Sequence, residues 1–223
     1  MNTSALRTLS RAIPMSHATP IVFVVDDDPS VREALESLII QAGWRPQVFV
    51  SAQEFLEHPR TLVPSCLVLD VTLPGLSGLE LQSLVAVDRT DMPIIFITGH
   101  ADVPMTVKAM KAGAVEFLTK PVSEEVLISA IHGAIARSRV TLEKESELQT
   151  LRGRYAKLTP REREVMTFVV RGLLNKQVGG ELGMAEITVK AHRGQVMRKM
   201  NAASFADLVN MAARLGFSPP STR

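Results

Sequence analysis

The chain alternates between short, continuous runs of apolar residues and longer segments whose apolar residues recur every three or four positions. The runs lie at residues 21–25, 48–50, 66–69, 94–97 and 115–118. Continuous apolar runs bounded by turn residues are typical of strands that are buried on both faces of a parallel sheet. Strands that alternate with helices predict an α/β fold, here a doubly wound parallel sheet of five strands.

The segments between the runs have the spacing of amphipathic helices. We expect helices over residues 29–42, 52–56, 76–87 and 103–112, and a longer one from residue 123 to residue 154. The second half of this longer helix is rich in charged residues and would leave the sheet as a linker.

The linker carries a few apolar residues at irregular spacing. They are Leu142, Leu148, Leu151 and Tyr155. This pattern fits a simple linker helix, and it also fits a short dimer seam.

Polar residues follow several of the predicted strands directly. They are Asp26, Asp27, Asp28, Asp70, Thr98 and Lys120. Because open α/β sheets bind ligands at the carboxyl ends of their strands, we expect these side chains to converge on one spot. Carboxylates suit Mg²⁺ or Mn²⁺, and a lysine with a hydroxyl suits a phosphoryl group, so a metal and phosphoryl site is predicted.

These residues, in this order and spacing, resemble the receiver domain of two-component response regulators over residues 20–137. The resemblance implies the strand order 2-1-3-4-5 and phosphorylation of Asp70. It implies that Asp26, Asp27, Asp70 and the backbone carbonyl of Thr72 hold the metal. It also gives Thr98, Lys120 and Phe117 the roles of phosphoryl contacts and switch residues, and it places Pro121 after a cis peptide bond. Asp28 is interpreted as a solvated turn residue.

Residues 98–105 and 108–114 are similar to the FixJ branch of the receivers. In that branch His100 is a loop residue beside the switch, and a phenylalanine usually stands where this chain has Val122.

The last third of the chain predicts a small all-α domain over residues 157–217. Thr159 and Glu162 form a capping box with a proline at the first helical position. Asn175 is placed to cap the next helix. A further helix is expected over residues 186–200, with Ile187 among its apolar positions, and a last one over residues 205–215.

Residues 158–216 resemble the C-terminal domain of NarL/FixJ regulators, which are LuxR-type, with a helix-turn-helix at 175–194. The resemblance implies that this domain binds double-stranded promoter DNA. The residues implied are Asn175, Lys176, Thr188, Lys190, Ala191, His192, Arg193 and Lys199. By this match Lys190 and Ala191 face bases or nearby backbone, whereas Thr188, His192, Arg193 and Lys199 meet phosphates, which position without specifying.

Three features depart from that family's usual pattern. Gly179-Gly180 interrupts the first helix of the motif, where a glycine costs about 1 kcal/mol relative to alanine. Gly194 lies inside the recognition helix. Ala185 occupies that helix's N-cap without a capping oxygen, a difference of about 1 kcal/mol. These departures predict a less stable DNA-reading domain.

The distribution of charge suggests that the first part of the chain and the last third bind different partners. The formal net charge is only +2, but residues 18–139 hold 15 acidic and 9 basic residues, whereas residues 155–223 hold 5 acidic and 11 basic. A basic domain suggests nucleic acid. The lone Cys66 excludes an intramolecular disulfide and a multi-cysteine metal site, and we expect it to be a buried packing thiol.

Taken together, the sequence predicts a response regulator that is not an enzyme and has no catalytic residues of its own. A sensor histidine kinase would phosphorylate Asp70, and the protein would dimerise, bind promoter DNA and act with RNA polymerase, as an activator. With no apolar stretch near the ~18 residues of a membrane span, we expect a cytoplasmic protein with no membrane partner. Residues 1–19 and 218–223 are expected to be disordered.

Two other functions fit parts of the pattern. Asp26-x-Asp28 behind a strand also fits the nucleophile and acid of haloacid-dehalogenase-type phosphohydrolases, which are turnover enzymes. A regulator that works without phosphorylation, through a ligand or its expression level, is the other alternative.

Overall fold

The computed structural model describes residues 18–100 and 102–217, so the segments expected to be disordered lie outside it except for residues 18 and 19. The chain divides into two compact units between Leu142 and Glu143. None of the described helices is long and apolar enough to cross a membrane.

The first unit is built on a five-stranded parallel sheet with the order β2-β1-β3-β4-β5, which confirms the predicted topology. The strands are β1 (Ile21–Val25), β2 (Arg45–Phe49), β3 (Ser65–Asp70), β4 (Ile94–Thr98) and β5 (Glu116–Thr119). The helices are α1 (Pro29–Gln41), α2 (Ala52–Glu57), α3 (Gly78–Asp88), α4 (Val103–Lys111) and α5 (Glu124–Ala156).

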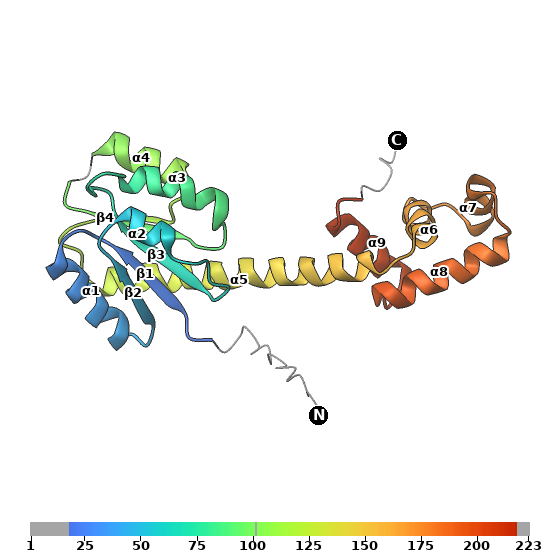
Figure 1. Ribbon diagram of the computed structural model, residues 1–223, viewed down its shortest axis with the longest axis horizontal. Coiled ribbons are helices and arrows are strands. Elements are labelled where there is room, and N and C mark those ends of the chain that lie inside the picture. Colours follow the sequence, from blue (N-terminus) through green and yellow to red (C-terminus); the bar gives the residue numbers. More distant parts are fainter. Residues whose placement is uncertain (1–17, 101, 218–223) are drawn as a thin grey trace, which may run out of the picture. The chain divides into compact units, whose positions relative to one another are not determined.

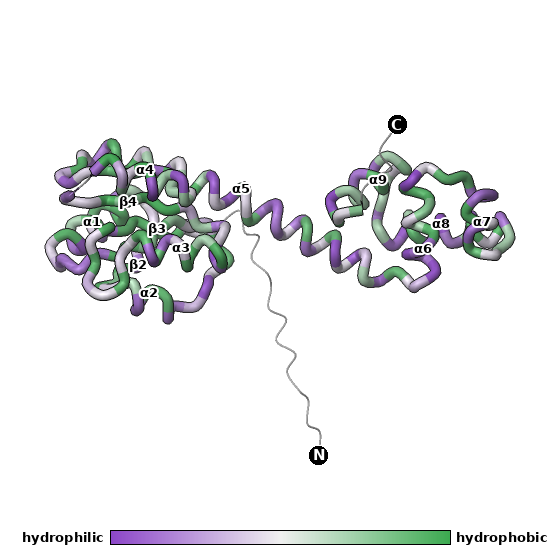
Figure 2. Tube along the Cα trace, turned by 90° about the horizontal axis from the view of Figure 1, so that it is seen from above, coloured by the Kyte–Doolittle hydropathy of each residue, from purple (hydrophilic) through white to green (hydrophobic). Residues whose placement is uncertain are grey.

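Helices cover both faces of this sheet (Figure 1). On one face α2, α3 and α4 pack over alternate residues of the strands, around Phe23, Phe55 and Phe96. On the other face α1 and α5 pack over the remaining strand residues. Apolar residues are concentrated along the strands (Figure 2), as a sheet buried on both faces requires. Cys66 is buried here, and burial raises the pKa of its thiol, as expected of a packing residue.

Two predicted boundaries are wrong by a few residues. The second strand begins at Arg45 and not at residue 48, because backbone pairing with β1 extends to polar residues that carry no apolar signal. The third helix begins at Gly78 and not at residue 76, because Ser77 forms its N-cap. The Ser77 hydroxyl accepts from the backbone N–H of Glu80, and the Glu80 carboxylate accepts from that of Ser77.

The second unit is a helical core. Its helices are α6 (Pro160–Val170), α7 (Asn175–Leu182), α8 (Glu186–Met200) and α9 (Phe205–Arg214). The C-terminal part of α5 contributes to this core, where Leu151 is buried and Tyr155 packs against the buried residues. Leu151 therefore packs within its own chain, which argues against its use in a dimer seam.

The helix caps confirm two expectations and correct a third. Thr159 and Glu162 form the predicted capping box, and Ala185 is an N-cap without a side-chain hydrogen bond. Asn175 is not a cap: it is the first residue of α7, and Leu174 stands at the N-cap. Gln177 satisfies the N-cap residue itself, since its Oε1 accepts from the backbone N–H of Leu174 at 2.8 Å, and Leu174 gives the helix no side-chain cap.

The glycine pair in α7 has a packing reason at one position only. A Cβ at Gly179 would lie 2.7 Å from the carbonyl oxygen of Met184, in the turn that leads to α8. A Cβ at Gly180 would meet nothing within 4 Å. Gly179 therefore permits the close approach of α7 and the turn, whereas Gly180 carries only the helical cost of a glycine.

A buried ion pair connects α6 to α8. The Lys199 ammonium donates to Glu162 Oε2 at 2.6 Å, and the same oxygen accepts from the backbone N–H of Thr159 at 2.7 Å. Glu162 is only 4% exposed. Burial opposes its ionisation, but the hydrogen bonds from Lys199 and Thr159 outweigh burial, and the pKa of Glu162 is lowered. The first turn of α6 is thereby tied to the last turn of α8.

This lowered pKa predicts acid-sensitive stability in the second unit. A carboxylate whose pKa is lower in the folded state stabilises the fold above its unfolded pKa of 4.5, and that contribution is lost as the pH falls through the folded value. We expect Glu162→Gln to lower the free energy of unfolding by about 1–2 kcal/mol near neutral pH and by less near pH ~4. Urea titrations followed by circular dichroism measure the free energy of unfolding at each pH.

Glu164→Gln is the matched control, because Glu164 lies on the same helix and pairs with Arg161 at the exposed surface. Its effect should stay within about 0.5 kcal/mol at either pH. Two outcomes would contradict the stabilising role of the Glu162 ion pair. One is an equal decrease in the free energy of unfolding in both variants, and the other is a decrease in Glu162→Gln that is no smaller in acid.

Candidate functional site

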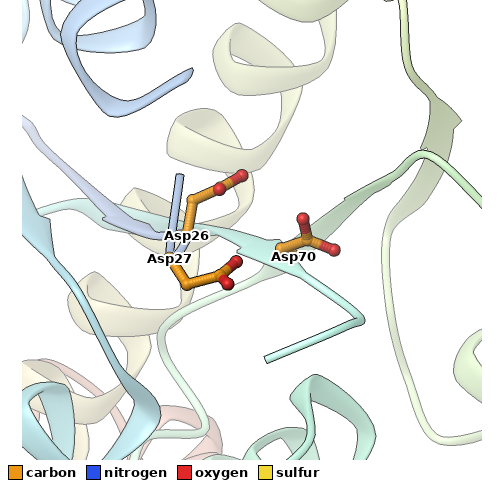
Figure 3. A group of neighbouring side chains, drawn as sticks. All are labelled: Asp26, Asp27 and Asp70. Carbon is orange, nitrogen blue, oxygen red and sulfur yellow. The ribbon is translucent and has the colours of Figure 1, made fainter. Parts of the chain in front are cut away.

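Three carboxylates meet at the carboxyl edge of the sheet (Figure 3). Asp26 and Asp27 follow β1, and Asp70 is the last residue of β3. One oxygen from each of the three lies within 4.8 Å of the others. Asp26 is 2% exposed and Asp70 7%, whereas Asp27 is exposed. The expected convergence is therefore present, because β1 and β3 are neighbours and end at the same edge.

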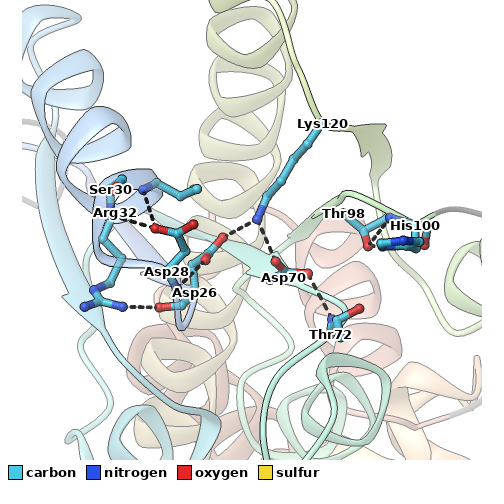
Figure 4. Close-up of polar contacts among 10 residues, drawn as sticks. Asp26, Asp28, Ser30, Arg32, Asp70, Thr72, Thr98, His100 and Lys120 are labelled. Atoms are coloured by element: carbon cyan, nitrogen blue, oxygen red, sulfur yellow. Dashed lines mark hydrogen bonds and ion pairs between the residues drawn. The ribbon is translucent and has the colours of Figure 1, made fainter.

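A single cation bridges two of these carboxylates (Figure 4). The Lys120 ammonium donates to Asp26 Oδ2 and to Asp70 Oδ2, each at 2.6 Å. Burial raises the pKa of Asp26 in spite of this contact. Burial also opposes the charge on Lys120, but its bonds to the two carboxylates outweigh burial and its pKa is raised. The predicted cis peptide bond between Lys120 and Pro121 is present.

Backbone donors hold the carboxylates in place. The N–H of Thr72 donates to Asp70 Oδ1 at 2.9 Å, and the N–H of Asp28 donates to Asp26 Oδ1 at 3.0 Å. Sequence reasoning missed Arg32, whose guanidinium donates to the backbone carbonyl of Asp26 at 2.6 Å. Its position one turn into α1 gave no signal, since an arginine on a helix is usually solvated.

Gly78 is a second residue that the sequence did not single out. A Cβ at this position would lie 2.3 Å from the carbonyl oxygen of Asp70, and the Gly78 N–H donates to the carbonyl of Val71. The start of α3 thus rests directly on the backbone of Asp70. Any larger residue would displace the end of β3 that carries this carboxylate.

Thr98 and Phe117 occupy neighbouring strands beside the cluster. Thr98 is fully buried at the end of β4, where its Oγ1 accepts from the backbone N–H of His100 at 3.3 Å. The ring of Phe117 on β5 is half-buried, with its centroid 5.8 Å from that of Phe96. His100 itself is exposed in the loop, as predicted.

Asp28 has a defined role that sequence reasoning did not give it. Its Oδ1 accepts from the backbone N–H groups of Ser30 and Val31, so Asp28 is the N-cap of α1. Asp28 is exposed, as predicted for a solvated turn residue, and it also caps the helix because Pro29-Ser30 begins α1 immediately.

The donor set fits a hard divalent cation. Among the described residues these three carboxylates are the only cluster of potential metal ligands, and they offer oxygen atoms alone. Within the cluster only Lys120 compensates their three negative charges. A cation that neutralises the remaining charge would lower the repulsion between the carboxylates.

The predicted DNA-contact residues of the second unit lie on α7 and α8, and they differ in how far they are exposed. Thr188, Lys190 and Ala191 are exposed, and Lys176 is exposed on α7. His192, Arg193, Lys199 and Asn175 are half-buried. Ile187, one of the apolar positions of this helix, is 72% exposed. The buried face of α8 is formed by Val189, Val196 and Met200.

Arg193 and Lys199 have partners within the unit. The guanidinium of Arg193 donates to Asn175 Oδ1 at 3.3 Å and lies 4.7 Å above the ring of Phe205. Lys199 is paired with Glu162. Their contacts with phosphate stay predictions, and their removal would also disturb packing between helices.

Comparison with known families assigns both units. Residues 22–132 match the family described as "Response regulator receiver domain", and residues 156–212 match "Bacterial regulatory proteins, luxR family".

Whole-chain relatives have the same organisation. Nodulation protein W of Bradyrhizobium diazoefficiens is 50% identical over 202 residues, covering 91% of this chain and 89% of the relative. Response regulator protein TodT of Pseudomonas putida is 43% identical, with 90% and 88% coverage. The transcriptional regulatory protein FixJ of Bradyrhizobium diazoefficiens is 40% identical, with 87% and 95% coverage.

Solved structures of two response regulators are similar to this chain over most of its length. The response regulator StyR is 47% identical with a TM-score of 0.79, covering 88% of this chain and 100% of StyR. Full-length FixJ from B. japonicum is 39% identical with a TM-score of 0.53, covering 89% and 98%. The chain therefore belongs to the two-component response regulators of the NarL/FixJ type, which join a receiver domain to a LuxR-type DNA-binding domain.

Proposed function

We propose that this protein is a cytoplasmic transcriptional activator that a sensor histidine kinase switches on by phosphorylating Asp70. The observation that carries the proposal is the Lys120 ammonium held between Asp26 and Asp70, beside a third carboxylate. A structural ion pair needs one carboxylate for one lysine. Three carboxylates around one lysine leave an excess of negative charge that suits a metal and a phosphoryl group.

The residues define the chemistry of the transfer. Asp70 Oδ1 is held by the Thr72 N–H and Oδ2 by Lys120, so the carboxylate is fixed in orientation. A carboxylate oxygen of Asp70 attacks the phosphorus of a donor phosphohistidine. A P–O bond forms, the P–N bond breaks, and its electron pair stays on the imidazole nitrogen.

Asp26, Asp27, Asp70 and the carbonyl of Thr72 would hold Mg²⁺ or Mn²⁺. When bound, the cation neutralises the attacking carboxylate and the incoming phosphoryl oxygens. After transfer, Lys120 would keep its contact with the site through a phosphoryl oxygen.

Thr98 and Phe117 would pass the change to the surface. Among the described residues the Thr98 hydroxyl is held by long, 3.3 Å contacts with His100 alone, so a phosphoryl oxygen offers it a stronger partner. Its movement would open space for the neighbouring Phe117 ring to turn inward. Such a coupled movement is a two-state switch biased by a local change in charge.

The surface next to this switch suits a second copy of the receiver. Val103, Val107 and Met110 follow helical spacing along α4, and all three are exposed. Exposed apolar side chains that line up on one helix are typical of an interaction surface. We propose that phosphorylated receivers dimerise through α4 and β5, so that two C-terminal domains bind a two-fold promoter site and act with RNA polymerase.

The phosphohydrolase alternative has less support. It needs Asp28 as an acid facing the substrate, but the Asp28 carboxylate accepts from two backbone N–H groups of α1. A regulator independent of phosphorylation would not need the excess carboxylates at the sheet edge.

We expect phosphorylation to be confined to Asp70 and to need a divalent cation. Wild-type protein incubated with a small acyl phosphate and Mg²⁺ should gain one phosphoryl group by intact mass, and Asp70→Asn should gain none, because the nucleophilic oxygen is absent. Asp28→Asn is the matched control and should react as wild type, since asparagine caps a helix as well as aspartate does. Modification of Asp70→Asn at the wild-type rate would refute the assignment. Loss of reaction in Asp28→Asn with steady phosphate release by wild type would favour the hydrolase.

We expect the phosphorylated receiver to dimerise through α4. Sedimentation of full-length protein with Mg²⁺ and beryllofluoride, an acyl-phosphate mimic, should show a shift from monomer to dimer at micromolar concentration. Val107→Glu should abolish the shift, because it buries a charge in the interface. Val87→Glu, at an exposed valine of α3, is the control and should dimerise normally. A wild-type protein of unchanged mass, or dimers unaffected by Val107→Glu, would rule out this surface.

We expect Lys190 to contribute to sequence discrimination. It is exposed in the first turns of α8, where recognition-helix residues meet base edges. Lys190→Ala should weaken binding to a selected site by about 1–3 kcal/mol and reduce its preference over random DNA. Lys157→Ala, at an exposed lysine outside the motif, should leave the preference unchanged. Titrations of the selected duplex and of random DNA over a salt series give the comparison. An unaltered preference in Lys190→Ala would contradict a contact between Lys190 and the bases.

A further inference from the structure

One exposed face of α8 carries no hydrogen-bonding side chain in its N-terminal half. Ile187, Ala191, Gly194 and Arg198 are spaced four, three and four residues apart, which places them on one face of the helix, and all are exposed. In the N-terminal half of this face the side chains are a branched alkyl group, a methyl group and a hydrogen atom. The charged residues Lys190 and Glu186 are exposed beside this half of the face.

The exposure of Ile187 has no explanation within the described part of the unit. The core of this unit takes Val189, Val196 and Met200 from α8 and leaves Ile187 out. Isolated exposed apolar residues are common on protein surfaces. This one, however, lies in the first turn of the recognition helix, in a domain of the LuxR family.

The chemistry of base edges identifies what such a face can read. Adenine is read by asparagine or glutamine, and guanine by arginine or lysine, whereas the C5-methyl group of thymine is read by apolar contact. The one amide on α8, Gln195, accepts a hydrogen bond from Arg198. In its first two turns the helix therefore offers an apolar surface for methyl groups beside the Lys190 ammonium, with the Glu186 carboxylate and the Thr188 hydroxyl also exposed.

We propose that Ile187 is a specificity-determining residue that contacts a thymine C5-methyl group in the major groove. The inference rests on the proposed binding of DNA and adds to it the identity of a base. Because Ile187 and Lys190 are one turn apart, the thymine and a guanine read by Lys190 lie within a few base pairs of each other in each half-site.

The test compares thymine with deoxyuridine, which differs only by the methyl group. A duplex is selected from random DNA with full-length protein, Mg²⁺ and beryllofluoride, and is then resynthesised with deoxyuridine at every thymine. We expect wild-type protein to bind the deoxyuridine duplex about fourfold more weakly for each methyl group contacted. Ile187→Ala should bind the thymine duplex about as weakly as wild-type protein binds the deoxyuridine duplex. Its affinity should fall little further when thymine is replaced by deoxyuridine.

This non-additivity is the supporting result, because two changes that remove the same contact do not add. Val87→Ala, which truncates an exposed valine of α3, is the matched control and should keep the full difference between the duplexes. An equal thymine preference in wild type and Ile187→Ala would overturn the role of Ile187, and so would identical wild-type affinities for the two duplexes. In both cases specific binding to the selected duplex would leave the proposed function standing. If no sequence is enriched or bound, the DNA-binding function itself fails.

Discussion

The contact of Lys120 with Asp26 and Asp70 is the interaction on which the first unit depends. A carboxylate that is nearly inaccessible to water, such as Asp26, is costly unless it is paired and hydrogen-bonded. One ammonium serves two such groups, and it also joins the end of β5 to the ends of β1 and β3. Among the described residues no ion pair forms with Asp27, which lies exposed at the surface. The site is thus stable enough to fold and still has unbalanced charge for a metal and a phosphoryl group to neutralise.

Backbone geometry holds this arrangement as firmly as charge does. Gly78 lets α3 begin against the carbonyl of Asp70, and Arg32 ties α1 to the carbonyl of Asp26. Two helices are therefore attached to the strand ends that carry the carboxylates. Under the proposed function, a change at Asp70 would act on α3 through the carbonyl against which Gly78 rests.

The second unit uses its charges differently. Basic residues that pattern alone would assign to DNA are partly committed to the fold, since Lys199 pairs with buried Glu162 and Arg193 lies on Phe205. On the face of α8 that holds Ile187, the side chains of the N-terminal half are small or apolar, and the exposed Lys190 lies beside them. In this unit the total positive charge therefore overstates how much of the surface is available to phosphates.

The sequence by itself determined the sheet, the helix positions to within a few residues and the polar residues at the strand ends, whereas the strand order came from its resemblance to receiver domains. It could do so because apolar periodicity is local and because parallel strands place their carboxyl ends together. Only the tertiary structure decided which groups pair across elements: Lys120 with two carboxylates, Lys199 with Glu162, and Gly78 and Gly179 against distant carbonyls. Such contacts join residues far apart in the chain and depend on distances of a few ångströms. For the same reason the apolar pattern of α8 could not separate Ile187, which the packing of the helices leaves exposed, from Val189, which it buries.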